Sequence, residues 1–87
     1  MFNSTKRFYK FLNKCKCCGI RLKSVKYDYE LSEFVYHFCK VQFSGNNTYF
    51  YDDDYWIRVS EAMIVDLDDL YNAVIDGVCG RYGLKKD

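Results

Sequence analysis

The sequence predicts an α+β domain in which a three- or four-stranded antiparallel sheet is flanked by an N-terminal and a C-terminal helix. Two observations predict this class. Apolar residues recur at helical spacing near both ends of the chain, and the middle is rich in β-branched and aromatic residues separated by turn signals. The length of 87 residues, with 49% hydrophobic and 29% charged residues, fits one small domain over residues 1–87.

The first expected element is an amphipathic helix over residues 4–15. Its apolar side chains recur three or four residues apart and form one stripe, made of Phe8, Phe11, Leu12 and Cys15. Ser4 or Thr5 is suited to cap its N-terminus, because a hydroxyl oxygen accepts a hydrogen bond from a backbone N–H of the first turn. Gly19 is expected to break the helix.

Residues 20–31 and 34–43 are the next two expected strands. The first alternates between apolar and polar side chains, with a phase slip at Lys23 and Ser24 that indicates a bulge or a bend. The second is dominated by β-branched and aromatic residues and contains no residue that breaks a strand.

A turn over residues 44–47, with the sequence Ser-Gly-Asn-Asn, separates these strands from two shorter ones. The shorter strands are expected over 48–51 and 55–59. The three aspartates over 52–54 lie between them and predict a solvated loop.

Residues 67–78 predict a second helix, whose expected buried stripe is Leu67, Leu70, Tyr71, Val74 and Val78. Asp66 is suited to cap its N-terminus, and Gly77 and Gly80 are expected to end it. Residues 60–65 fit either a strand or a helical turn.

Cysteine and histidine side chains offer a candidate structural zinc site. Residues 15–19, Cys-Lys-Cys-Cys-Gly, contain a Cys-x₂-Cys-Gly turn that resembles a zinc knuckle. His37 and Cys39 lie two residues apart on one expected strand, so their side chains share a face of that strand. The predicted Cys₃His ligand set is Cys15, Cys18, His37 and Cys39. The alternatives are free buried thiols, which are common for cysteine in a reducing compartment, or disulfides.

Charge is distributed unevenly along the chain. Residues 1–27 carry eight positive charges and no acid, whereas residues 28–80 carry eleven acids against Lys40 and Arg58. Such segregation indicates either two binding surfaces of opposite charge or two segments that neutralise each other in the fold.

The main functional expectation is a small, non-catalytic regulatory module that binds a partner protein. Its predicted contact surface combines acidic and aromatic side chains, which are Tyr49, Tyr51, Asp52, Asp53, Asp54, Tyr55 and Trp56. Tyr and Trp are favoured at the centres of protein interfaces, and clustered acids complement a basic partner. The alternative for these aromatics is a place in the core with a polar tip at the surface.

Nucleic-acid binding through the basic N-terminal segment is the alternative function. The residues predicted to contact phosphates are Lys6, Arg7, Lys10, Lys14 and Lys16. Arg21, Lys23 and Lys26 extend this patch if their strand lies alongside the helix. The same lysines also fit an ordinary solvated helix face.

Enzymatic activity is not expected, because the sequence contains no glycine-rich phosphate loop, no nucleophile elbow and no recognisable triad. No apolar run is long enough to cross a bilayer, and the N-terminus lacks the apolar region of a signal peptide. We therefore expect an intracellular, cytoplasmic protein without a membrane partner and, apart from zinc, without a cofactor.

Overall fold

The computed structural model describes residues 4–43 and 49–85 of the chain. The elements in chain order are α1 (Ser4–Cys17), β1 (Ile20–Asp28), β2 (Glu33–Phe43), β3 (Tyr49–Ser60), the short 3₁₀ helix η1 (Glu61–Met63) and α2 (Leu67–Tyr82). This order confirms the predicted α+β class, with one helix at each end of a three-stranded antiparallel sheet.

The strands form a meander in the order β1-β2-β3, so that each strand pairs with its neighbour in sequence. The register between β1 and β2 shifts between Leu22 and Ser24, which confirms the predicted irregularity at Lys23. β1 ends at Asp28, earlier than expected. The Asp28 carboxylate accepts hydrogen bonds from the backbone N–H groups of Glu30 and Leu31, at 3.0 and 3.1 Å, which turns the chain toward β2.

β3 corrects the prediction of two short strands joined by an aspartate loop. It is one strand, in which the register against β2 shifts opposite Cys39 and Lys40. Cys39 pairs with Asp54 and Lys40 pairs with Asp52, so Asp53 is the extra residue of a bulge, with a φ of 66°. Aspartate tolerates this left-handed conformation better than most residues, which lets the strand continue. The predicted turn over 44–47 lies outside the described residues.

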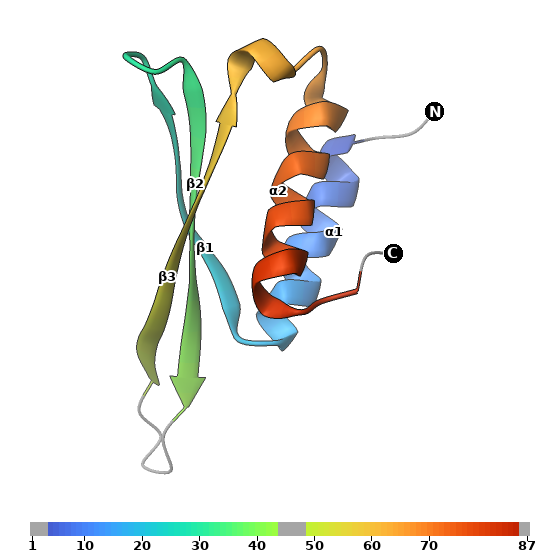
Figure 1. Cartoon of the computed structure of the whole chain (residues 1–87). Coiled ribbons are helices and arrows are strands. Elements are labelled where there is room, and N and C mark those ends of the chain that lie inside the picture. Colours follow the sequence, from blue (N-terminus) through green and yellow to red (C-terminus); the bar gives the residue numbers. More distant parts are fainter. Residues whose placement is uncertain (1–3, 44–48, 86–87) are drawn as a thin grey trace.

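Both helices lie on one face of the sheet (Figure 1), where α1 contacts β1 and α2 contacts β3. Asp66 caps α2 as predicted, and its side chain accepts a hydrogen bond from the backbone N–H of Asp69 in a reciprocal capping box. The predicted end of α2 is wrong, because the helix continues past Gly77 and Gly80. It ends at Tyr82, and Gly83, with a φ of 69°, supplies the left-handed cap.

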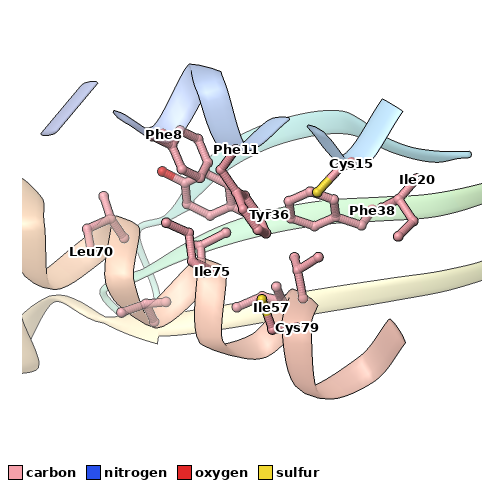
Figure 2. Close-up of a cluster of buried hydrophobic side chains, with 13 residues drawn as sticks. Phe8, Phe11, Cys15, Ile20, Tyr36, Phe38, Ile57, Leu70, Ile75 and Cys79 are labelled. Atoms are coloured by element: carbon pink, nitrogen blue, oxygen red, sulfur yellow. The ribbon is translucent and has the colours of Figure 1, made fainter. Parts of the chain in front are cut away.

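The core lies between the helices and the inner face of the sheet, which is the face turned toward them (Figure 2). The Phe8 ring stacks on Tyr71 of α2, with centroids 4.4 Å apart and planes at 9°, and meets the ring of Tyr36 edge-on at 6.0 Å. These contacts join α1, α2 and β2 in one cluster. Its other buried members are Phe11, Cys15, Ile20, Phe38, Ile57, Val59, Leu70, Val74, Ile75, Val78 and Cys79.

The opposite face of the sheet carries no helix among the described elements, and we call it the outer face (Figure 1). Strand alternation and the pairing register assign it Arg21, Ser24, Lys26 and Asp28 of β1, Glu33, Val35, His37 and Cys39 of β2, and Asp54, Trp56, Arg58 and Ser60 of β3. Charged side chains are therefore concentrated on the uncovered side of the sheet, together with Trp56 and His37.

Candidate functional site

A groove of about 770 Å³ lies where α1 runs beside β1. Its lining residues are Tyr9, Leu12, Asn13 and Lys16 of α1, Arg21, Leu22 and Lys23 of β1, and Val41 of β2. We call this feature the basic groove.

Local structure explains why these side chains converge. The four residues from α1 are spaced three or four apart, so they form one stripe of the helix, adjacent to the stripe that enters the core. On β1 the side chain of Leu22 packs against the core, whereas those of Arg21 and Lys23 are exposed. The groove therefore has an apolar lining from Leu12 and Leu22, with cations beside it.

The described charged residues that line the basic groove are all positive. Lys16, Arg21 and Lys23 contribute three cations, and within the described part of the chain no Asp or Glu lines the groove. Tyr9 also lines the groove, and this aromatic residue is 62% exposed to solvent. A concave surface lined by like charges concentrates the electrostatic potential and attracts anions.

The structure gathers only part of the basic set predicted from the sequence. Lys16 lies in the groove, but Lys14 is directed elsewhere and donates a hydrogen bond from Nζ to the carbonyl oxygen of Lys85 at 3.2 Å. Arg7 lies two helical turns before Lys14 on the same side of α1, and it does not line the groove either. Lys6 and Lys10 are exposed and do not line the groove.

The missing cations come from β1. The sequence placed Arg21 and Lys23 in the patch only on the condition that their strand lies alongside the first helix, and α1 does contact β1. Lys26, the third residue expected to extend the patch, instead lines a smaller hollow on the outer face. The alternation of β1 was visible in the sequence, but the side on which the helix packs was not.

The predicted acidic and aromatic surface is divided between the two faces of the sheet. Tyr55 packs edge-on against Tyr82 at 6.2 Å, and the Arg81 guanidinium lies 5.1 Å from the centre of the Tyr55 ring. Arg81 also forms an ion pair with Asp53, which lowers the pKa of that carboxyl group below its ordinary value. These contacts place Asp53 and Tyr55 against the end of α2.

The other described members of that surface lie on the outer face. Trp56 stacks flat on His37, with ring centroids 3.8 Å apart and planes at 4°, and His37 Nε2 lies 2.8 Å from Asp54 Oδ1. Because neighbouring residues of a strand point to opposite faces, the four described residues of this set, Asp53, Asp54, Tyr55 and Trp56, do not lie on one face of the sheet. The side chains of Tyr49, Tyr51 and Asp52 lie outside the described part of the structure.

The predicted zinc ligands are separated by the sheet. Cys15 is 1% exposed within the core on the inner face (Figure 2), whereas His37 and Cys39 belong to the outer face and Cys18 is exposed at the end of α1. Burial, together with the nearby thiols of Cys79 and Cys18, raises the pKa of Cys15 to about 11.

Among the residues that the structure describes, no three His, Cys, Asp or Glu side chains are grouped so that they could hold a metal ion. The four predicted ligands therefore do not converge, and bound zinc stays a prediction from the sequence alone.

Neither helix within residues 4–43 and 49–85 has the length and apolar character needed to span a bilayer. Comparison of the chain with protein-family models, with curated proteins and with solved structures finds no match.

Proposed function

We propose that this protein binds a nucleic-acid strand through the basic groove. The observation that supports this proposal is the convergence of Lys16, Arg21 and Lys23 with the exposed ring of Tyr9, in a groove without a lining acid among the described residues. Cations that follow a groove beside an aromatic ring are typical of surfaces that contact the phosphates and bases of a strand.

The groove suits the backbone of a strand because its three cations come from two elements that lie side by side. Lys16 lies near the end of α1, and Arg21 and Lys23 follow within one short turn of chain. Each phosphate that a cation neutralises releases counterions, so the free energy of binding depends on salt. The apolar lining beside the cations offers contact to sugars and bases.

This proposal is favoured over protein binding through the acidic and aromatic surface. The carboxylates of Asp53 and Asp54 already contact Arg81 and His37 within the chain, so a basic partner has to compete with these contacts. Protein binding through that surface stays a prediction. Its test is a pull-down with Asp54→Lys, which should lose the partner if the outer part of the surface is used.

The test of the proposed function is fluorescence anisotropy with a labelled single-stranded oligonucleotide and a set of charge reversals. Lys16→Glu, Arg21→Glu and Lys23→Glu should each weaken binding by about tenfold or more, because each replaces a phosphate contact by repulsion. Lys10→Glu is the matched control, since it makes the same change at an exposed site of α1 outside the groove. Because Lys10 is not among the lining residues, this change removes no predicted phosphate contact, and we expect about a twofold effect or less.

All four variants change exposed side chains, so the fold should persist, and circular dichroism checks this. Equal losses for Lys10→Glu and the groove variants would mean that net charge alone drives binding. That result, or the absence of binding by the unmodified protein, would contradict the proposal.

A further inference from the structure

A second concave surface lies on the outer face, away from the basic groove. It is a hollow of about 330 Å³ lined by Lys26, Tyr27, Asp28, Val35, Trp56 and Arg58, and we call it the outer-face hollow. The proposed function assigns it no role.

Trp56 makes this hollow unusual because its indole ring is both held in place and accessible. The ring stacks flat on His37, which lies directly opposite it on β2, and the contact between His37 Nε2 and Asp54 Oδ1 at 2.8 Å holds the imidazole. Trp56 nevertheless remains 49% exposed. A ring supported on one face and open to solvent offers a preorganised platform for a further planar group.

Two cations accompany this platform. Lys26 lines the hollow, and Arg58 is oriented by hydrogen bonds from Nη1 to Asp28 Oδ2 at 3.2 Å and to Glu33 Oε1 at 3.3 Å. These bonds use one nitrogen of a guanidinium group that has five N–H donors. Asp28 is the acid that lines the hollow, and its ion pair with Arg58 offsets its charge.

The basic groove and the outer face share cations. Arg21 and Lys23 line the groove, yet Arg21 lies directly opposite Cys39 of the outer face in the register of β1 and β2. Burial is the largest cause that raises the pKa of the Cys39 thiol, Asp54 raises it as well, and Lys23 and Arg21 lower it, which agrees with the position of Arg21 opposite Cys39 in the register. Farther along β1, Lys26 is an outer-face residue and continues the series of cations to Trp56.

We infer that the ligand is a single strand, which leaves the basic groove at Arg21 and Lys23, passes Lys26 and stacks one base on the free face of Trp56. This inference rests on the proposed function and narrows its ligand. A base within a duplex is stacked on both faces and is not available to the indole, whereas an unpaired base is. The chemistry of stacking is shared by single-stranded DNA and RNA.

The fluorescence of Trp56 provides a direct readout, because this residue is the only tryptophan of the chain. Unlabelled single-stranded DNA, single-stranded RNA of the same length and the corresponding DNA duplex are titrated separately. We expect one or both single strands to quench the fluorescence at the concentration at which anisotropy reports binding. The duplex should leave it unchanged, and the stronger of the two single-strand responses identifies the preferred nucleic acid.

Substitution of Trp56 separates the contribution of base stacking to binding from the contribution of charge. Trp56→Ala should weaken single-strand binding by about tenfold, whereas Trp56→Phe should retain most of the affinity because it keeps a ring for stacking. Tyr29→Ala is the matched control, since Tyr29 is an exposed aromatic residue that lines neither concave surface. We expect about a twofold effect or less at that site.

The outcomes distinguish this inference from the proposed function. Binding by anisotropy with unchanged Trp56 fluorescence and unchanged affinity of Trp56→Ala would overturn the inference and leave the proposed function standing. Equal quenching by the duplex would also overturn it. The absence of any binding would remove both.

Discussion

At the scale of single residues, the cysteines show how much the surroundings of a thiol decide its role. Cys15 lies in the core with a raised pKa, whereas Cys18, three residues later, is exposed. Both belong to the same Cys-x₂-Cys turn, but only Cys15 falls on the apolar stripe predicted for the first helix. The structure separates them because α1 turns one side toward the sheet and ends directly afterwards at Cys17.

Replacement of these two cysteines by serine should therefore have unequal effects on stability. Cys15→Ser places a hydroxyl group in an apolar core and should lower the free energy of unfolding by about 1–3 kcal/mol. Cys18→Ser should change it by about 0.5 kcal/mol or less, because the site is exposed. Urea unfolding under reducing conditions measures both, with and without a zinc chelator. Similar losses at the two sites, together with destabilisation by the chelator, would instead support a structural zinc ion.

Asp28 provides a second prediction at this scale, because its pKa is lowered. Hydrogen bonding from the Leu31 backbone is the largest lowering cause, followed by the Arg58 guanidinium. A carboxyl group with a lowered pKa stabilises the fold above its unfolded-state pKa of about 3.9, and this stabilisation is lost as the pH falls through the folded-state value.

Asp28→Asn keeps the acceptor oxygen for the backbone N–H groups and removes the charge. We expect this variant to unfold at a lower urea concentration than the unmodified protein at pH 7, and the difference to disappear at a pH well below about 3.9. Glu30→Gln, at an exposed neighbouring site, is the control and should follow the unmodified protein. A difference that persists in acid would show that the charge of Asp28 is not the cause.

At the scale of elements, helix α2 contains two glycines with different surroundings. A Cβ atom at Gly77 would lie 3.1 Å from Cδ1 of Ile57 on β3, so this glycine permits a close approach of helix and strand. Nothing lies within 4 Å of a Cβ atom at Gly80, which is exposed. The sequence predicted a helix end at both positions, because glycine is a poor helix former. Packing of α2 on the sheet outweighs that preference.

Substitution of the two glycines should shift stability in opposite directions. Gly80→Ala should stabilise the protein by about 0.5–1 kcal/mol, since alanine has the higher helix propensity and meets no neighbour. Gly77→Val should destabilise it by about 1–3 kcal/mol, because the branched side chain has to displace Ile57. Thermal unfolding followed by circular dichroism measures both. A stabilising Gly77→Val would refute the close approach.

β3 shows that local strand propensity is not enough to predict where a strand is interrupted. Three consecutive aspartates have low strand propensity, and an isolated segment of this kind is typical of a loop. In the fold, Asp53 occupies a bulge and pairs with Arg81, which is 28 residues away in the sequence, while Asp54 contacts His37 on the neighbouring strand. Partners this distant cannot be inferred from local propensity. By contrast, the bulge at Lys23 interrupts a regular alternation and was predicted for that reason.

At the scale of the whole molecule, the placement of both helices on one face determines which residues are available for binding. The helix stripes around Phe8 and Val74 and the strand alternation were visible in the sequence, so the α+β class could be predicted. The relative position of α1 and β1 could not, because either edge of the sheet can receive the helix. The basic groove depends on that choice, and only Lys16 was therefore predicted for it without a condition.

The ion pairs of the described residues also clarify the uneven charge distribution. Asp28, Asp53 and Asp54 of the acidic middle pair with Arg58, Arg81 and His37, which all lie outside the basic first 27 residues. Among the residues that the structure describes, no acid lines the basic groove. Within the described residues, these three acids are thus paired by groups other than the basic first 27 residues.

The central claim is that a nucleic-acid strand neutralises the cations of the basic groove, and the salt dependence of binding tests it most directly. The affinity for a labelled single-stranded oligonucleotide is measured by anisotropy over a series of salt concentrations. Three groove contacts predict a slope of log K against log salt of about −2, and a fourth contact at Lys26 predicts about −3. Arg21→Glu should reduce the magnitude of the slope by about 0.7. A slope near zero, or no binding at low salt, would contradict the account.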